Sequence, residues 1–298
     1  MTERLPPTEA ADETTRGLDL LPTPELVEIL VRGQRRAVEA ALAAGPQIAR
    51  AVDEIAARLE RGGTLHYVGA GTSGRIGVLD AAEVPPTFGT PPALVRAHIA
   101  GGPQALTAAV EGAEDDAVAV RELESQWSST DAVIGISASG GARYVVAALE
   151  SARAAGAYTI ALTSAPESPL ARAAELAIVL ETGAEALAGS TRMIAGTAQK
   201  VALNALSTAT MVRLGKIYDN LMVDLVATNE KLQRRARRLV CELAAVEDAR
   251  ARELLAAANG SVKVAVVMAR CDLDAQRARG ALEAAGGRLR AALSADHA

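Results

Sequence analysis

Aromatic side chains are scarce in this chain of 298 residues, which has one tryptophan, four tyrosines and one phenylalanine. Surfaces that stack bases or sugar rings are built from aromatic side chains, so the composition argues against both kinds of surface. The formal net charge of −5 is a smaller argument against a nucleic-acid partner. Cysteine is also rare. Cys241 and Cys271 are too few for a disulfide framework or a structural zinc site, which suits a reducing cytoplasm.

Other features are missing as well. No apolar run approaches the roughly 20 residues of a membrane-spanning helix, and no basic-then-apolar leader opens the chain, so we expect a cytoplasmic protein without a membrane partner. Of the three histidines, His66 and His98 fall on predicted strands, where histidines more often belong to the core or edge than to a ligand site. No nucleophilic triad can be assembled, and no His, Cys and Asp cluster has metal-ligand spacing, so we expect no metal.

The hydrophobic residues predict the fold class. They make up half of the chain and are mostly Ala, Leu and Val, which favours closely packed helices. The predicted strands are Leu65–Val68, Leu94–Ile99, Ala132–Ser137, Tyr158–Thr163 and Ala177–Leu180, and the helices between them are Ser73–Ala82, Ala105–Val110, Asp115–Gln126, Ala142–Ala155 and Pro169–Glu175. This alternation predicts an α/β fold. Its mainly parallel five-stranded sheet has helices on both faces and ligands beyond the carboxyl ends of the strands.

Further helices flank the predicted sheet. A polar arm (1–21) precedes a helix that starts at Thr23-Pro24-Glu25 and a second one from about Gln47 to Glu60, and a long helix follows the sheet to about Leu214. The basic run Lys231–Arg238 is typical of a solvated helix face, with nucleic-acid contact as the rarer alternative. Short helices near 246–257, 262–269, 274–285 and 289–293 complete the chain. We therefore divide it into an arm with helices (1–50), a sheet domain (51–225) and a small helical domain (226–298).

The most informative stretch is the turn that follows the first strand. Gly69, Gly71 and Gly74 remove side chains that would keep a ligand from the backbone, and Thr72 and Ser73 place hydroxyl groups at a helix start, where the dipole favours an anion. The pattern predicts a phosphate site, although glycines also occur where they only make a turn. A Walker loop is excluded because Gly74-Arg75, not Lys, follows Ser73, and a dinucleotide site lacks its acid downstream. A small phosphorylated molecule is the better candidate ligand.

Polar residues follow other strands of the same predicted sheet. Ser137 and Ser139 open a second small-residue loop, and Ser190 and Thr191 precede the long helix, where they either cap it or hold a ligand. Two carboxylates, Glu83 and Glu114, lie on predicted loops near the anion site. Such a pair can act as acid and base if their environments separate their pKa values. From these residues alone, an enzyme and a sensor of phosphate esters remain equally open.

Seven segments together point to one family. They are GAGTSGR (Gly69–Arg75), LDAAEVPPTFG (Leu79–Gly89), IAGG (Ile99–Gly102), AVEGAED (Ala109–Asp115), GSTRM (Gly189–Met193), AGTAQK (Ala195–Lys200) and NLMVDLVATNEKL (Asn220–Leu232). In these segments the chain resembles the N-acetylmuramic acid 6-phosphate etherases, bacterial enzymes with a sugar isomerase (SIS) domain. The resemblance implies a three-layer α/β/α SIS domain and a homodimer with sites near the subunit interface.

The resemblance also implies an activity. Enzymes of this family cleave the lactyl ether of N-acetylmuramic acid 6-phosphate by elimination and water addition, giving N-acetylglucosamine 6-phosphate and D-lactate, with no metal or organic cofactor. By position in the motifs, Glu83 matches the acid and Glu114 the base. The polar ligand-binding loops of the family match the hydroxyl residues Thr72, Ser73, Ser137, Ser139, Ser190 and Thr191.

Some positions depart from the family pattern, and other functions compete. Gly141-Ala142-Arg143 stand where the family has Arg-Thr-Pro, and Ile194 replaces a lysine; both changes bear on substrate affinity. A non-catalytic phosphosugar-binding regulator of the glucokinase regulatory protein type is the main alternative, but the chain has the length of one SIS domain and keeps both carboxylates. Aldose–ketose isomerases share the glycine loop but not the segments around Glu83 and Glu114. A transcription regulator lacks support, because no helix-turn-helix segment precedes the sheet.

Overall fold

The computed structural model describes residues 6–225 and 230–295. The chain packs as two compact units: residues 1–82 with 92–208, and residues 83–91 with 209–298. The predicted boundary between residues 225 and 226, and part of the segment Asn220–Leu232, lie outside the described residues.

The first unit is built on a five-stranded sheet with the order β2-β1-β3-β4-β5, in which every neighbouring pair is parallel. The strands are β1 (Leu65–Gly69), β2 (Val95–Ile99), β3 (Ala132–Ile136), β4 (Tyr158–Thr163) and β5 (Leu176–Val179). Leu65 lies opposite Val95 on one side and Ala132 on the other. Every residue of β1, β3 and β4 is buried, as a parallel sheet with two covered faces requires. The five predicted strands are confirmed, each to within one residue at its ends.

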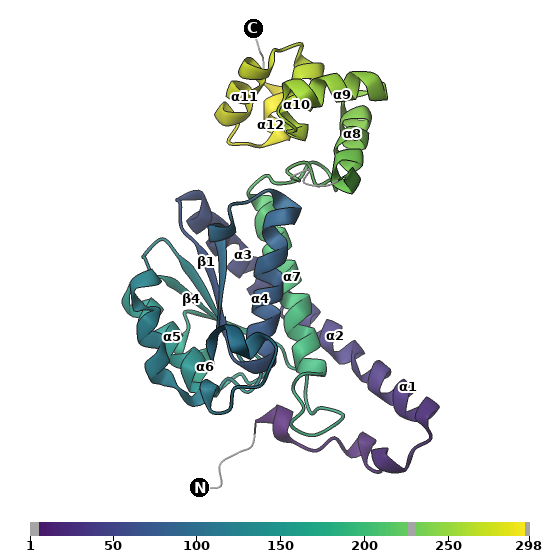
Figure 1. The fold of residues 1–298 in the computed structure, drawn as a ribbon. Helices are drawn as coiled ribbons and strands as arrows, with labels where there is room; N and C mark the ends of the chain where they lie inside the picture. The colour runs from purple at the N-terminus through teal and green to yellow at the C-terminus, as the bar shows by residue number, and fades with distance from the viewer. Residues whose placement is uncertain (1–5, 226–229, 296–298) are drawn as a thin grey trace. The chain divides into compact units, whose positions relative to one another are not determined.

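Helices cover both faces of this sheet (Figure 1). On one face, Val68, Val133 and Ala161 share an apolar cluster with α5 (Arg143–Ala154) and α6 (Pro169–Ala173). On the other face lie α3 (Gly45–Glu60), α4 (Gly71–Phe88) and α7 (Ile194–Arg213). A Cβ atom added to Gly77 of α4 would lie 3.1 Å from Tyr67 and 3.3 Å from Ile136, so α4 packs directly on the sheet. The predicted three-layer architecture is confirmed.

The N-terminal helices differ in one detail from the sequence analysis. The predicted single helix from residue 23 is divided at Gln34 into α1 (Thr23–Gly33) and α2 (Arg35–Ala43). At this break the Gln34 side chain donates through Nε2 to the Leu30 carbonyl at 3.4 Å and accepts through Oε1 from Thr197 of α7 at 2.8 Å. The arm before α1 forms short 3-10 turns at Pro7–Glu9, Glu13–Thr15 and Leu18–Leu20.

Two predictions around the candidate carboxylates are wrong. The helix predicted at Ser73–Ala82 leaves Glu83 on a loop, but α4 continues through Pro85 and Pro86 to Phe88. The two prolines lack N–H groups, yet the helical ladder resumes beyond them, since the Gly89 N–H donates to the Pro85 carbonyl at 2.9 Å. Glu83 therefore lies on a helix.

The segments Ala105–Val110 and Asp115–Gln126, which were predicted to be helices, are described by the structure and do not form α-helices. Short 3-10 turns replace them at Gly102–Leu106, Ala113–Asp115, Ala117–Glu122 and Glu124–Gln126. Gly101, Gly102 and Gly112 have φ values of +82°, +65° and +72°, which interrupt an α-helix. Asp116 then caps the turn after it by accepting from the Val118 and Ala119 N–H groups.

The C-terminal unit has an apolar core of its own. Its helices are α8 (Glu230–Ala244), α9 (Asp248–Ala257), α10 (Val262–Cys271), α11 (Ala275–Ala284) and α12 (Leu289–Ser294). Val266 and Val267 of α10 are fully buried at its centre. The basic run begins on α8 with Lys231 exposed, as a solvated helix face requires. Lys263 is buried and donates to Asp224, Gly215 and Gly287 at 2.6, 2.9 and 2.7 Å, which fastens the segment before α8 to this core.

No single helix in the described ranges is long and apolar enough to cross a membrane. Helices α9 and α10 pass the length and composition test only together, as a pair bent by 111°. Their apolar residues form the core of the C-terminal unit.

Candidate active site

The candidate site begins in the turn between β1 and α4. Its glycines meet different structural requirements. A Cβ atom on Gly69 would lie 2.6 Å from the Gly74 nitrogen, and one on Gly74 would lie 2.6 Å from the Ile99 side chain, so close packing of the turn requires both. Gly71 has a φ of +53° and open space where a Cβ would be. Of these three glycines, Gly71 is thus the one at which a ligand can approach the backbone.

The first turn of α4 is open to an anion. Within the described part of the chain, the N–H groups of Gly71, Thr72 and Ser73 have no side-chain acceptor. These groups carry the positive end of the helix dipole. Ser73 is buried, and its hydroxyl donates to Oε1 of Gln199, on α7, at 3.0 Å. This helix start therefore has three N–H groups without a side-chain acceptor among the described residues, and the Ser73 hydroxyl beside them is already engaged.

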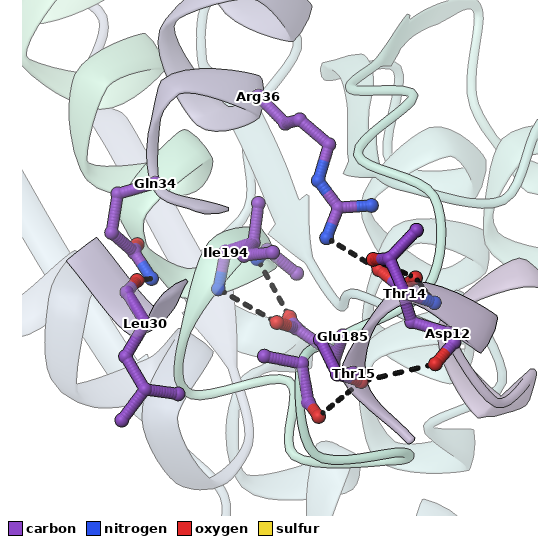
Figure 2. Close-up of polar contacts among 10 residues, drawn as sticks. Asp12, Thr14, Thr15, Leu30, Gln34, Arg36, Glu185 and Ile194 are labelled. Atoms are coloured by element: carbon purple, nitrogen blue, oxygen red, sulfur yellow. Dashed lines mark hydrogen bonds and ion pairs between the residues drawn. The ribbon is translucent and has the colours of Figure 1, made fainter. Parts of the chain in front are cut away.

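The start of α7 lies beside this turn, but its N–H groups are already paired with a side chain of the chain itself. A Cβ atom on Gly196 would be 3.4 Å from the Thr72 methyl group, so the two helix starts are neighbours. Glu185 is fully buried, and its carboxylate accepts hydrogen bonds from the Ile194 and Ala195 N–H groups, both at 2.9 Å (Figure 2). Glu185 thus supplies the internal anion for this helix.

Ser190 and Thr191 consequently do not cap α7 with their side chains. Their backbone carbonyls accept from Met193 and Gly196 at 3.1 and 2.9 Å, and both side chains are partly exposed. Of the two roles left open by the sequence, the cap belongs to Glu185. The sequence held only a faint signal for it, an acid nine residues before the helix and separated from it by a loop.

The N-terminal arm holds this loop in place (Figure 2). The Thr15 hydroxyl donates to the Ala186 carbonyl at 2.9 Å, and the Gly189 N–H donates to the carbonyl of the fully buried Thr8 at 3.1 Å. Arg36 of α2 lies 3.2 Å from the Asp12 carboxylate, and hydrogen bonds from Thr14 and the charge of Arg36 lower the pKa of Asp12. The arm therefore braces the segment that carries Ser190 and Thr191, a role its polar sequence gave no reason to expect.

The loop after β3 is braced from within. The Ser137 hydroxyl accepts from the Gly140 N–H at 3.1 Å, and the Ser139 hydroxyl accepts from the Gly141 N–H at 3.3 Å. Ser137 is buried, whereas Ser139 is partly exposed. Each hydroxyl accepts in these bonds and so keeps its proton for a further acceptor.

The two candidate catalytic carboxylates are both exposed. Glu83 lies on α4, and Glu114 lies in the 3-10 turn Ala113–Asp115. Within the described residues neither side chain has a hydrogen bond or an ion pair. Arg75 ties α4 to the segment before Glu114, because its guanidinium donates to the Leu106 and Ala108 carbonyls at 3.2 and 2.9 Å. Sequence reasoning had given Arg75 no role beyond excluding a Walker loop.

A cavity of about 560 Å³ lies at the end of β2 in the same unit. Its lining includes His98, Gly101, Gly102, Leu106, Glu122 and Tyr144. His98 Nε2 lies 3.0 Å from Nδ1 of the buried His66, and burial lowers the pKa of both imidazoles to about 4. The two rings are therefore neutral at physiological pH. No group of three or more His, Cys, Asp and Glu residues that could hold a metal occurs in the part of the chain that the structure describes.

Comparison with known proteins defines the class of the domain. Residues 47–153 match the glucokinase regulatory protein N-terminal SIS domain, and residues 109–209 match the SIS domain. A phosphoheptose isomerase from Francisella tularensis shares the fold with a TM-score of 0.51 and 19% identity, covering 64% of this chain and 98% of that chain. The protein is therefore a SIS-domain protein.

Full-length relatives define the family. The chain is 50% identical over 287 residues to the N-acetylmuramic acid 6-phosphate etherases of Salmonella choleraesuis and Salmonella typhimurium, covering 96% of this chain and 97% of each relative. The chain belongs to the N-acetylmuramic acid 6-phosphate etherase family.

Proposed function

We propose that the chain cleaves the lactyl ether of N-acetylmuramic acid 6-phosphate with water, giving N-acetylglucosamine 6-phosphate and D-lactate. The observation that carries this proposal is the 50% identity to named etherases over 96% of the chain, which extends beyond the SIS domain into the arm and the C-terminal unit. The same relatives favour an enzyme, a carbon–oxygen lyase, over a phosphosugar-binding regulator.

The open start of α4 is the proposed phosphate site. The N–H groups of Gly71, Thr72 and Ser73 and the two hydroxyls among them suit the 6-phosphate, because donors and the helix dipole both favour a dianion. The Gly74 N–H donates to the Ala70 carbonyl at 3.1 Å, so Gly74 serves the site only by lacking a side chain. The free protons of Ser137 and Ser139, and the partly exposed side chains of Ser190 and Thr191, supply further contacts to the sugar. We assign these contacts to the sheet domain, residues 51–225.

The proposed chemistry needs one base and one acid. Glu114 removes the proton from the carbon that bears the acetamido group, which is acidic because it adjoins the open-chain aldehyde. That C–H electron pair forms a carbon–carbon double bond while the bond to the lactyl oxygen breaks, and Glu83 protonates this oxygen. Water then adds across the double bond, restoring the proton and placing a hydroxyl group where lactate left. None of these steps uses a metal or an organic cofactor.

A second copy of the chain is the proposed cover for the site. Val27, Val31, Val38 and Leu42 lie four or seven residues apart along α1 and α2 and are 51%, 65%, 47% and 73% exposed, which makes an apolar stripe on one side of these helices. Two exposed carboxylates must hold opposite protonation states near neutral pH, and partial burial separates pKa values. We propose a homodimer in the cytoplasm that buries this stripe and completes each site.

Incubation with N-acetylmuramic acid 6-phosphate and an assay for D-lactate tests the activity directly. We expect lactate and N-acetylglucosamine 6-phosphate in equal amounts; no lactate from folded protein would refute the proposed function. Light scattering at the assay concentration tests the assembly. We expect a dimer that Leu42→Lys weakens, and an active monomer would contradict the proposed dimer.

A further inference from the structure

Gln199 lies beneath the proposed phosphate site. It is on α7, its side chain is 1% exposed, and its Oε1 accepts the Ser73 hydroxyl at 3.0 Å. Its other amide atom, Nε2, is buried and has no hydrogen-bond partner among the described residues. A buried donor without a partner destabilises the fold, so its presence beside the serine of the proposed phosphate site calls for an explanation.

The single proton of Ser73 creates a conflict with phosphate binding. A hydroxyl group has one proton to donate, and here the carbonyl end of the Gln199 amide receives it. A phosphate dianion only accepts hydrogen bonds, so a Ser73 oxygen with both lone pairs outward would repel it. Rotating the amide by 180° about its last torsion angle removes the conflict. Nε2 then donates to the Ser73 oxygen, gains its missing partner, and leaves the serine proton free for the phosphate.

Contacts of the neighbouring residues fix the backbone that carries Gln199. Glu185 fixes the first turn of α7 through the Ile194 and Ala195 N–H groups, and Gly196 packs against Thr72 one turn before the amide. The backbone of Gln199 is therefore held beside Ser73, and the amide can exchange its two ends in place.

We infer that Gln199 is a positioning residue for substrate: its amide sets whether the Ser73 hydroxyl faces the ligand as a donor or as an acceptor, and phosphate binding selects the orientation in which Nε2 donates to Ser73. This inference rests on the proposed function in taking a phosphosugar as the ligand.

Two variants separate the orientations. Gln199→Glu keeps the shape but offers only acceptors when ionised, so it holds the Ser73 proton away from the ligand. Gln199→Met removes both polar ends and leaves that proton free. We expect Gln199→Glu to weaken binding of N-acetylglucosamine 6-phosphate by about ten- to a hundred-fold, the equivalent of one charge-assisted hydrogen bond, and Gln199→Met to weaken it less. Asn204→Asp, an exposed amide on the same helix, controls for the added charge.

Coupling to Ser73 distinguishes positioning from a merely structural role. In a Ser73→Ala background, Gln199→Met should cause no further loss of affinity, and Gln199→Glu alone should raise KM while kcat is largely kept. Additive losses, or wild-type affinity in Gln199→Glu, would overturn the inference. The binding assay does not need catalysis. A wild-type protein that binds N-acetylglucosamine 6-phosphate but releases no lactate would refute the proposed reaction and leave the Gln199 test in force.

Discussion

Helices α4 and α7 begin side by side in the same unit but differ in what pairs with the N–H groups of their first turns. Each helix start presents unpaired N–H groups and about half a positive charge. At α7 the buried carboxylate of Glu185 fills that position at 2.9 Å from two N–H groups. At α4 the described residues supply no such acceptor, and hydroxyl groups surround the opening instead.

The difference indicates which helix start serves the fold and which serves a ligand. A start that carries its own anion has nothing to gain from a second one, because like charges repel in a buried setting. A start without an internal anion is stabilised by whatever anion arrives. The same kind of helix end therefore acts as a structural element at α7 and as the proposed phosphate site at α4.

Removing the internal anion should have the largest effect on stability. Glu185→Ala leaves two buried N–H groups without a partner and removes two charge-assisted hydrogen bonds, worth about 1.5–3 kcal/mol each, so we expect the free energy of unfolding to fall by about 3 kcal/mol or more. Denaturant titration measures the loss. The exposed Glu181→Ala, four residues earlier, is the matched control and should change stability little. Equal losses of stability in the two variants would contradict the role of Glu185 as the internal anion of α7.

His66 provides a buried polar group that the fold satisfies incompletely. Among the residues that the structure describes, its Nε2 has no hydrogen-bond partner and lies 3.9 Å from Asp131, while burial and the charges of His98 and Arg96 lower the pKa of His66 to about 4. The unfolded chain binds this proton below pH 6.5 and the folded chain does not, so stability is full above 6.5 and falls as the pH decreases toward 4. The total for His66 is on the order of 3 kcal/mol.

Stability measured at pH 7.5 and 5.5 tests this sign, because most carboxylates stay ionised in that window. His98 has the same lowered pKa, so we expect the wild type to lose about 2–3 kcal/mol and a His66→Phe variant to lose about half as much over the same interval. A wild type that becomes more stable on acidification would show that the imidazole is charged in the folded state.

The smallest predicted effect is the difference between alanine substitutions at two glycines of the α4 start. Gly74→Ala places a Cβ 2.6 Å from the Ile99 side chain and 2.8 Å from the Gly69 carbonyl, so overpacking should cost about 1–3 kcal/mol of stability. Gly71→Ala meets open space and pays only for its φ of +53°, about 1 kcal/mol. Gly71→Ala should instead reduce affinity for the phosphosugar. Thermal unfolding and calorimetric titration of both variants test the distinction.

The sheet and the anion loop were predictable from sequence because their signals are local. A few neighbouring residues are enough to predict a strand such as Leu65–Val68, and the same holds for a glycine-rich turn with Thr72 and Ser73. The segment 102–126 was predicted wrongly because its Ala, Leu and Glu residues favour a helix in isolation, whereas Gly101, Gly102 and Gly112 set backbone angles that only the folded chain reveals.

The contacts that complete the site join distant parts of the chain. Gln199 meets Ser73 across 126 positions, and Thr15 meets Ala186 across 171. Nothing in either local sequence marks such a partner. The sequence itself indicated Glu83 and Glu114 only as two acids near the anion loop, and their separate roles as acid and base came from the family resemblance.

Deuterium exchange at the carbon that bears the acetamido group tests the assigned roles of these two acids most directly. Exchange needs the base alone, so Glu83→Gln should still incorporate solvent deuterium while releasing lactate about a hundred- to ten-thousand-fold more slowly than wild type. Glu114→Gln should lose both activities. Normal exchange in Glu114→Gln with none in Glu83→Gln would reverse the roles, and normal exchange and lactate release in both variants would contradict the catalytic account.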